Sequence, residues 1–322
     1  MIFGPCGGVR TDGRCEMQPG KCVFEQIVRW PGLPAAVAPV SAPLVLTDLS
    51  VPPADPVSLS ATARILGPSC DAVLVGDHQD RPDFPPTMLA ELLSTAGVVP
   101  WVTLACRDRN RVVLEQELQG LRQNGKATVL CVTGDGRAFD VRPDVTQVFD
   151  LDGTRLVALA AEIGVPAAVP ETPTAPPLSV RPERLVEKQH AGAGIAVLNH
   201  VGSPGAVDAF LVQARRAGLT IPVVASVAVY TDHRSAAVLT ALPGLELDAA
   251  VVESVLTADD PVAAGIAAAV RQARALLAVD GVRGVNLSGM ASERGIAFAA
   301  EVQAEIGHRI RSERDPQGAG NH

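Results

Sequence analysis

The chain has 322 residues, of which 47% are hydrophobic and 19% charged, a composition that indicates a globular protein and excludes a disordered one. Its formal net charge of −8 argues against nucleic-acid binding, which needs clustered Lys and Arg. The start, MIFGPCGGVR, has no charged leader, and no apolar run approaches the roughly 18 residues of a membrane span. We therefore expect a cytoplasmic protein that acts on a small molecule, with no nucleic-acid or membrane partner.

From residue 43 onward, a short apolar run, a polar turn and a longer segment with helical spacing alternate eight times. Such alternation predicts a parallel sheet, and the nearly continuous apolar runs suit strands that are buried on both faces. Eight units at this length favour a closed (β/α)8 TIM barrel over an open doubly wound sheet. The predicted strands are residues 43–51, 70–78, 99–106, 126–135, 166–171, 194–201, 221–229 and 282–290.

Two segments between these strands illustrate the local signals. Residues 109–125, RNRVVLEQELQGLRQNG, space apolar residues three and four apart and end on Gly, as an amphipathic helix with a C-terminal glycine cap does. Residues 192–197, GAGIAV, come nearest to a dinucleotide-binding fingerprint, but they enter a strand instead of leaving one. We interpret them as a tight turn.

Three regions follow from this pattern. Residues 1–42 form a cysteine-bearing extension with a Pro/Ala-rich linker, residues 43–312 the barrel, and residues 313–322 a frayed tail. Residues 136–152 form a long connection after the fourth strand, and long loops at that end of a barrel usually shape the active site.

Polar side chains close most of the predicted strands. Barrel enzymes place catalytic groups at the C-terminal ends of their strands, so we expect these side chains to face a shared mouth. They are Asp48, Asp77, His78, Arg107, Asp108, Asp135, Glu171, Asn199 and His200. The alternative for each one is a helix-cap or turn role, which we assign to Asp150 and Asp152; His190 and His233 are interpreted as surface residues of helices.

Other catalytic signatures are missing from the sequence. It contains no G-x-S-x-G, H-E-x-x-H, P-loop or EF-hand motif. Cys106 and Cys131 lie inside apolar strands, where a buried thiol is expected instead of a nucleophile.

Several motifs in order resemble the methylenetetrahydrofolate reductase family, particularly the branch that is fused to homocysteine methyltransferases of methionine biosynthesis. TLACRDRNR (103–111) is similar to the family's H-L-T-C-R-D-x-N segment. The other segments are VLCVTGDG (129–136), VFDLDGTRLV (148–157), PETPTAPPL (170–178) and ERLVEKQHAGA (183–193). The extension, FGPCGGVRTDGRCEMQPGKCVF (3–24), resembles a cysteine module found on some reductases or on their partner subunits.

The resemblance implies an oxidoreductase that transfers a hydride from NAD(P)H to 5,10-methylenetetrahydrofolate, usually through FAD. It assigns Asp135 to the pterin and flavin, Asn199 to the folate in place of a Gln, and Lys188 to the flavin phosphates. Thr103 stands where relatives have His. Together with the strand-end residues Glu171, His78 and His200, Thr103 and Lys188 make up the expected cofactor-binding set.

The first strand departs from the family. Relatives place an acid three residues before a Pro-Pro pair, where this chain has Leu49, with Asp48 beside it. Adjacent strand residues face opposite sides, so Asp48 replaces that acid only if a β-bulge redirects it. Glu187 also replaces a basic residue beside Lys188, which lowers the positive charge for a flavin phosphate. We therefore expect direct hydride transfer from NADH without tightly bound FAD.

Two questions stay open at this point. Six cysteines are too few for a disulfide framework, and Cys6, Cys15 and Cys22 either bind Zn²⁺ with a further ligand or stay reduced thiols. The rival function is a non-catalytic accessory of one-carbon metabolism that handles folate or a corrinoid, with or without a protein partner. A carboxylate aimed at the barrel mouth from the first strand distinguishes the enzyme from the accessory.

Overall fold

A computed structural model describes residues 14, 30–36, 43–78, 81–134, 145, 148–175, 178–201, 203–241, 245, 247–289 and 291–312. Its strands pair in parallel and in chain order, and the eighth closes on the first, so the predicted TIM barrel is confirmed. The strands are β1 Leu44–Leu49, β2 Ala72–Val75, β3 Pro100–Ala105, β4 Thr128–Val132, β5 Ala167–Glu171, β6 Ile195–Leu198, β7 Val223–Ala228 and β8 Val282–Ser288.

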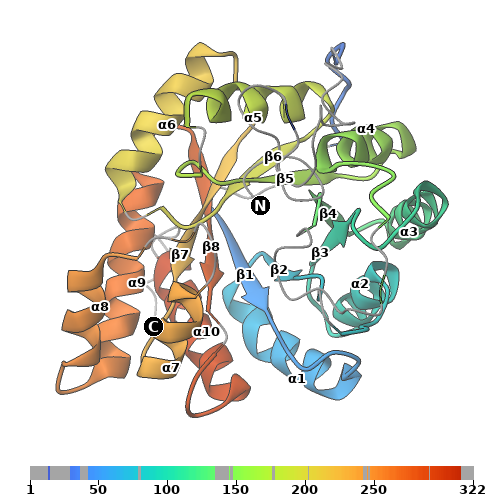
Figure 1. Ribbon diagram of the computed structural model, residues 1–322. Coiled ribbons are helices and arrows are strands. Elements are labelled where there is room, and N and C mark those ends of the chain that lie inside the picture. Colours follow the sequence, from blue (N-terminus) through green and yellow to red (C-terminus); the bar gives the residue numbers. More distant parts are fainter. Residues whose placement is uncertain are drawn as a thin grey trace, which may run out of the picture.

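Helices surround this barrel on the outside (Figure 1). They are α1 Pro56–Leu66, α2 Pro86–Thr95, α3 Arg111–Asn124, α4 Gly153–Ile163, α5 Arg181–His190, α6 Pro204–Arg216, α7 His233–Thr240, α8 Ala249–Leu256, α9 Pro261–Leu277 and α10 Ile296–Arg311, with short 3-10 turns η1 Gly67–Ser69 and η2 Leu178–Val180. Among the described helices, none has the length and apolar character needed to cross a membrane.

Each observed strand lies inside its predicted run. The predicted helix at 109–125 is α3, which begins after the side-chain cap of Asn110. It ends at Gly125, whose φ of 74° is a left-handed conformation that glycine adopts without strain. The turn interpretation of residues 192–197 also holds, since Gly192 has a φ of 109° and β6 begins three residues later.

The connection between β7 and β8 contains three helices, more than one repeat unit requires. Each helix begins at an aspartate whose carboxylate accepts backbone N–H bonds of the first turn: Asp232, Asp248 and Asp260. The three helices α7, α8 and α9 lie on the same side of the barrel (Figure 1).

The two aspartates assigned to a helix cap serve two different helices. Asp152 caps α4 and accepts the N–H of Arg155 at 2.8 Å, as predicted. Asp150 instead accepts the N–H of Arg111, the first residue of α3, at 2.9 Å. Asp150 therefore links the loop before α4 to the preceding repeat unit.

Residues 30–36 lie against the α5–β6 connection. The N–H of Leu33 donates to the carbonyl of His190 at 2.9 Å, and Trp30 and Leu33 pack against the main hydrophobic core. This contact ties the segment before the barrel to the end at which β6 begins.

Candidate functional site

Alternate residues of each strand face two environments. One hydrophobic cluster consists of strand residues alone, which places it inside the barrel; its members include Leu44, Leu46, Leu74, Trp101, Leu130, Val197 and Val224. Their chain neighbours, such as Val45, Val73 and Val102, pack with helix residues in a second cluster outside the barrel. The side of the strand therefore decides whether a polar side chain reaches the interior.

Asp48 belongs to the inner row of β1. It follows Leu44 and Leu46 at alternate positions, whereas Leu49 packs in the outer cluster. Pairing of β1 with β2 and β8 runs in register without a bulge. The expectation that Asp48 needs a bulge to face the mouth was therefore wrong, because position 48, not position 49, lies on the inner face.

Two polar side chains of β8 hold the Asp48 carboxyl group. The amide Nδ2 of Asn286 donates to Asp48 Oδ1 at 2.9 Å, and the Ser288 hydroxyl is a second hydrogen-bond partner. Asp48 keeps some exposed surface, yet burial raises its pKa, and the bonds from Ser288 and Asn286 only partly offset this effect. A carboxyl group with a raised pKa and two hydrogen-bond partners is suited to give up a proton.

Asn199 and Thr103 lie at the same end of the barrel. Asn199 follows Ile195 and Val197 in the inner row of β6 and is exposed, with its Nδ2 donating to Thr172 Oγ1 at 2.9 Å. Thr103 is half-buried between Trp101 and Ala105 on β3. These side chains and Asp48 thus come from the C-terminal parts of three different strands.

Glu171 and Lys188 form a buried ion pair instead. Glu171 is only 1% exposed and accepts bonds from Lys188 at 2.8 Å and from Arg181 at 3.3 Å, both on α5. It shares its side of β5 with Val169, which packs in the outer cluster. Burial alone would raise the pKa of Glu171, but the cations Lys188 and Arg181 outweigh it, so this pKa is lowered.

The two strand-end histidines differ in their surroundings. His78 is partly exposed and its Nε2 lies 3.4 Å from Asp83 Oδ2. His200 is buried, with 5% exposure, and among the described residues none bonds to its Nδ1. Burial lowers the pKa of His200 to about 4, so the imidazole is neutral near pH 7.

The remaining charged groups at the strand ends pair with one another. Arg109 Nη1 contacts Asp77 Oδ2 at 2.6 Å, and Arg107 pairs with Asp108 while its own side chain is 3% exposed. Asp77, Arg107 and Asp108 follow β2 and β3 as predicted, and each of them forms an ion pair.

Several predicted site residues lie outside the described residues. They are Asp135 and the cysteines Cys6, Cys15 and Cys22, so their roles stay predictions. Within the described part, no group of three or more His, Cys, Asp or Glu side chains is placed to hold a metal ion. The described Cys106 and Cys131 are buried free thiols whose pKa values burial raises, as the sequence predicted.

Asn286 and Ser288 were not identified from the sequence. The run VRGVNLS of β8 alternates polar Asn286 and Ser288 with apolar Val285 and Leu287, and this period of two marks one face of the strand as polar. The interior of this barrel is mostly apolar, so two polar residues on the inner face of one strand indicate a functional site.

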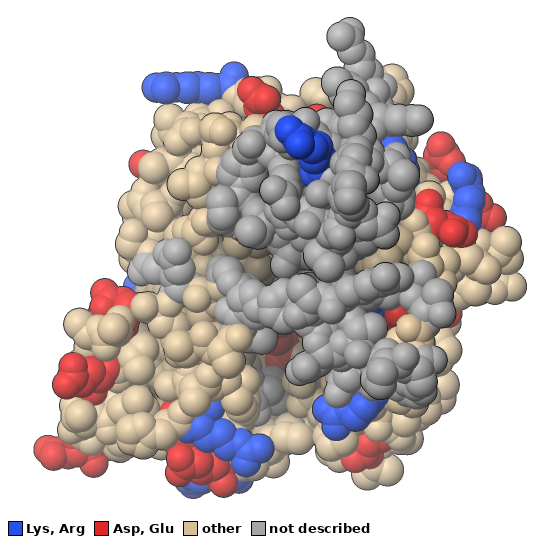
Figure 2. Space-filling model, in the orientation of Figure 1, with Lys and Arg blue, Asp and Glu red and all other residues tan. Residues whose placement is uncertain are grey.

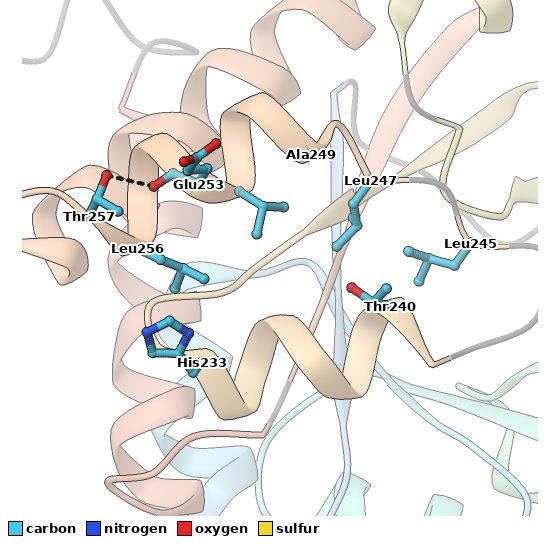
Figure 3. A pocket seen from close by; sticks show the side chains of 9 residues that line it. His233, Thr240, Leu245, Leu247, Ala249, Glu253, Leu256 and Thr257 are labelled. Carbon is cyan, nitrogen blue, oxygen red and sulfur yellow. Dashed lines mark hydrogen bonds between the residues drawn. The ribbon is translucent and has the colours of Figure 1, made fainter.

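A pocket with a volume of about 670 Å³ also lies between α7 and α8 (Figure 3). Leu245, Leu247, Val252 and Leu256 supply most of its apolar lining, and His233 lies at its edge. His233 is exposed on a helix, as predicted. None of the residues predicted for the site lines this pocket.

Figure 2 shows the charged side chains of the described residues on one face of the molecule. Acidic and basic side chains are interspersed along the edge of this face. This distribution agrees with the formal net charge of −8.

Fold and site together define a (β/α)8 barrel protein with an inward carboxyl group and amides at the C-terminal ends of its strands. The family model for methylenetetrahydrofolate reductase matches residues 66–302, and the chain belongs to this family. The match begins after β1, so Asp48 lies before it and Asn286 within it.

Comparison with solved structures agrees with this fold. An uncharacterized protein from Clostridium thermocellum, described as binding two copies of 5-methyl-5,6,7,8-tetrahydrofolic acid, superposes with a TM-score of 0.60 at 12% identity, covering 84% of this chain and 96% of the other. Tryptophan synthase from M. tuberculosis gives a TM-score of 0.48 at 17% identity over 84% and 93% of the two chains, too low to carry an argument. Among curated proteins, nothing matches.

Proposed function

We propose that this protein binds a reduced folate at the C-terminal mouth of the barrel and reduces its methylene group to a methyl group with a hydride from NAD(P)H. Family membership supports a reduced folate, and so does the folate bound by the C. thermocellum protein of the same fold. The observation that carries the proposal is Asp48, an acid on the inner row of β1.

The chemistry needs one hydride and one proton. The dihydronicotinamide C4–H bond breaks, its electron pair forms the new C–H bond at the methylene carbon, and NAD(P)H becomes NAD(P)⁺. The bond from that carbon to one folate nitrogen breaks, and the nitrogen takes the proton that Asp48 supplies. Solvent then reprotonates Asp48, whose raised pKa favours the acid form that this step requires.

Amide and hydroxyl groups would orient the pterin. Asn199 and Thr172, hydrogen-bonded to each other, offer donors and acceptors at the end of β6 and β5. The half-buried Thr103 on β3 stands where relatives have His. Asp135 keeps its predicted place at the pterin as part of this proposal, and zinc at Cys6, Cys15 and Cys22 stays a proposal for metal analysis with a Cys15→Ser control.

A tightly bound flavin does not fit the described residues. Lys188, the predicted phosphate contact, has its ammonium 2.8 Å from the Glu171 carboxylate and a further bond to the Pro170 carbonyl. A phosphate would have to displace that carboxylate, because both anions would compete for one buried cation. We therefore propose that the hydride passes directly from the nicotinamide to the folate.

The test is NADH oxidation with 5,10-methylenetetrahydrofolate, using purified protein whose flavin absorbance is measured first. We expect turnover without flavin, and 5-methyltetrahydrofolate as the product. Stoichiometric flavin absorbance would refute direct transfer. Folate binding without NADH or NADPH oxidation would refute the reductase and support the accessory function.

A further inference from the structure

The amide of Asn286 is held at one end only. Its Nδ2 donates to Asp48 Oδ1 at 2.9 Å. Its Oδ1 is buried, and among the residues that the structure describes no group donates to it. The residue as a whole is 4% exposed, so neither end of the amide is freely hydrated.

Asn124, the half-buried last residue of α3, shows the opposite situation. Its Nδ2 donates to Glu91 and Ser94, and its Oδ1 accepts the N–H of Lys126 at 3.3 Å. Contacts at both ends fix which way that amide points. The Asn286 amide lacks such a contact at Oδ1 within the described residues, so its orientation depends on Asp48 alone.

The two protonation states of Asp48 need different hydrogen-bond partners, a donor for the ionised form and an acceptor for the protonated form. An ionised carboxylate only accepts hydrogen bonds, so Nδ2 must face it. A protonated carboxyl group also donates, and Oδ1 of a reversed amide can accept that bond. Turning the amide by half a rotation at its terminal bond exchanges these two atoms in the same volume.

Resting on the proposed function, we propose that Asn286 is a positioning residue whose amide reverses as Asp48 gains and loses its proton, so that the carboxyl group stays hydrogen-bonded and aimed in both states. Ser288 complements this role, because a hydroxyl also donates or accepts. The unpartnered Oδ1 is the feature that permits the reversal.

Asn286 and Ser288 are the β8 side chains that form hydrogen bonds with Asp48. The inner row of β2 beside it holds Ala72, Leu74 and Gly76, which do not ionise, and the β8 row adds only Gly284. Further along the loop after β2, His78 is directed at Asp83, and Arg107 after β3 pairs with Asp108. Within the described residues, the pKa of Asp48 therefore depends on hydrogen bonds to Asn286 and Ser288 more directly than on nearby charges.

The experiment compares Asn286→Leu with Asn286→Thr, which restores a group that donates and accepts. Infrared titration of the Asp48 carboxyl band, taken as the difference from the same protein carrying Asp48→Asn, needs no ligand. Hydrogen bonds to an anion are stronger than neutral ones, so we expect the Leu variant to raise the midpoint by about one pH unit and the Thr variant to restore it in part.

Turnover gives the second readout. An acid must be protonated to act, so the rate falls as pH rises through its pKa. Without the amide that aims the carboxyl group, we expect Asn286→Leu to lower the rate by about tenfold near neutral pH. Because the variant also raises the pKa of Asp48, the falling limb should move to higher pH. Thr128→Val is the matched control, because it removes another buried, unpartnered oxygen, at the opposite end of the barrel, and should change neither readout.

The outcomes separate the two proposals. If the wild-type protein does not oxidise NADH, the proposed function is wrong. The infrared titration still tests the positioning role of Asn286 in that case. An unchanged midpoint in a folded Asn286→Leu protein overturns the positioning role. If that variant does not fold, Asn286→Asp keeps the volume, and two facing carboxyl groups should titrate as a coupled pair with one midpoint raised. Two independent midpoints in the ordinary range would overturn the inference.

Discussion

Two carboxyl groups at strand ends of this barrel, one half-buried and one fully buried, have opposite properties. Asp48 lies on the inner row of β1 beside the neutral side chains of Asn286 and Ser288, and burial raises its pKa. Glu171 lies on the outer side of β5 beside Lys188 and Arg181, which lower its pKa. Neutral partners leave Asp48 able to exchange a proton, whereas cations keep Glu171 ionised as part of the framework.

Replacement of the inner carboxyl group should have the largest effect. We expect Asp48→Asn to reduce NADH oxidation with methylenetetrahydrofolate by about 10²- to 10⁴-fold, the usual contribution of a general acid. The fold should persist, because the wild-type side chain is already a hydrogen-bonded group with a raised pKa. Steady-state kinetics and circular dichroism check both points, and a fully active variant would remove Asp48 from the mechanism.

Replacement of the outer carboxyl group should affect stability instead. We expect Glu171→Gln to cost about 3–5 kcal/mol in the free energy of unfolding, because Lys188 and Arg181 lose their buried counter-charge. The measurement is urea unfolding near pH 7. A second variant that also carries Lys188→Met should recover part of the loss, and a cost below about 1 kcal/mol would refute the structural role.

The pH dependence of this effect has a definite sign. The pKa of Glu171 is lowered in the folded state, so its contribution to stability is present above its ordinary value of 4.5 and is lost as pH falls through the folded value. The difference between wild type and Glu171→Gln should therefore shrink in acid.

His200 tests a buried strand-end group that has no charged partner among the described residues. Its pKa is lowered from 6.5 to about 4, so the unfolded chain binds the proton more strongly. The contribution of His200 to the free energy of unfolding is fully present above pH 6.5. It decreases by about 3 kcal/mol in total as the pH falls toward 4. Unfolding of His200→Leu should lack this part of the acid sensitivity; parallel pH curves for the two proteins would contradict it.

Gln303 on α10 should give the smallest effect. Its side chain is 0% exposed, and within the described residues neither amide atom has a hydrogen-bond partner. We expect Gln303→Met, of similar shape, to stabilise the protein by about 1–2 kcal/mol, because it removes two unsatisfied polar atoms from the core. Thermal unfolding measures it, and a lower midpoint would show that the amide has a partner after all.

Much of the fold could be predicted from local signals. The apolar runs predicted β1 to β8. Gly125 and Asp152 predicted the end of α3 and the start of α4. The three helices between β7 and β8 were not separated, although the aspartates before them are ordinary cap residues. Asp150 shows the limit of such signals, because its backbone partner Arg111 lies 39 residues away.

The sequence by itself determined the barrel, its strands, the family resemblance and the set of polar residues at the strand ends, because these depend on periodicity and on motifs along the chain. Only the tertiary structure decided which of those residues face the interior. Barrel closure brings Asn286 to Asp48 across 238 positions, and the packing of α5 on β5 commits Lys188 to Glu171. Partners so distant in the chain set burial and charge, and no local pattern encodes them.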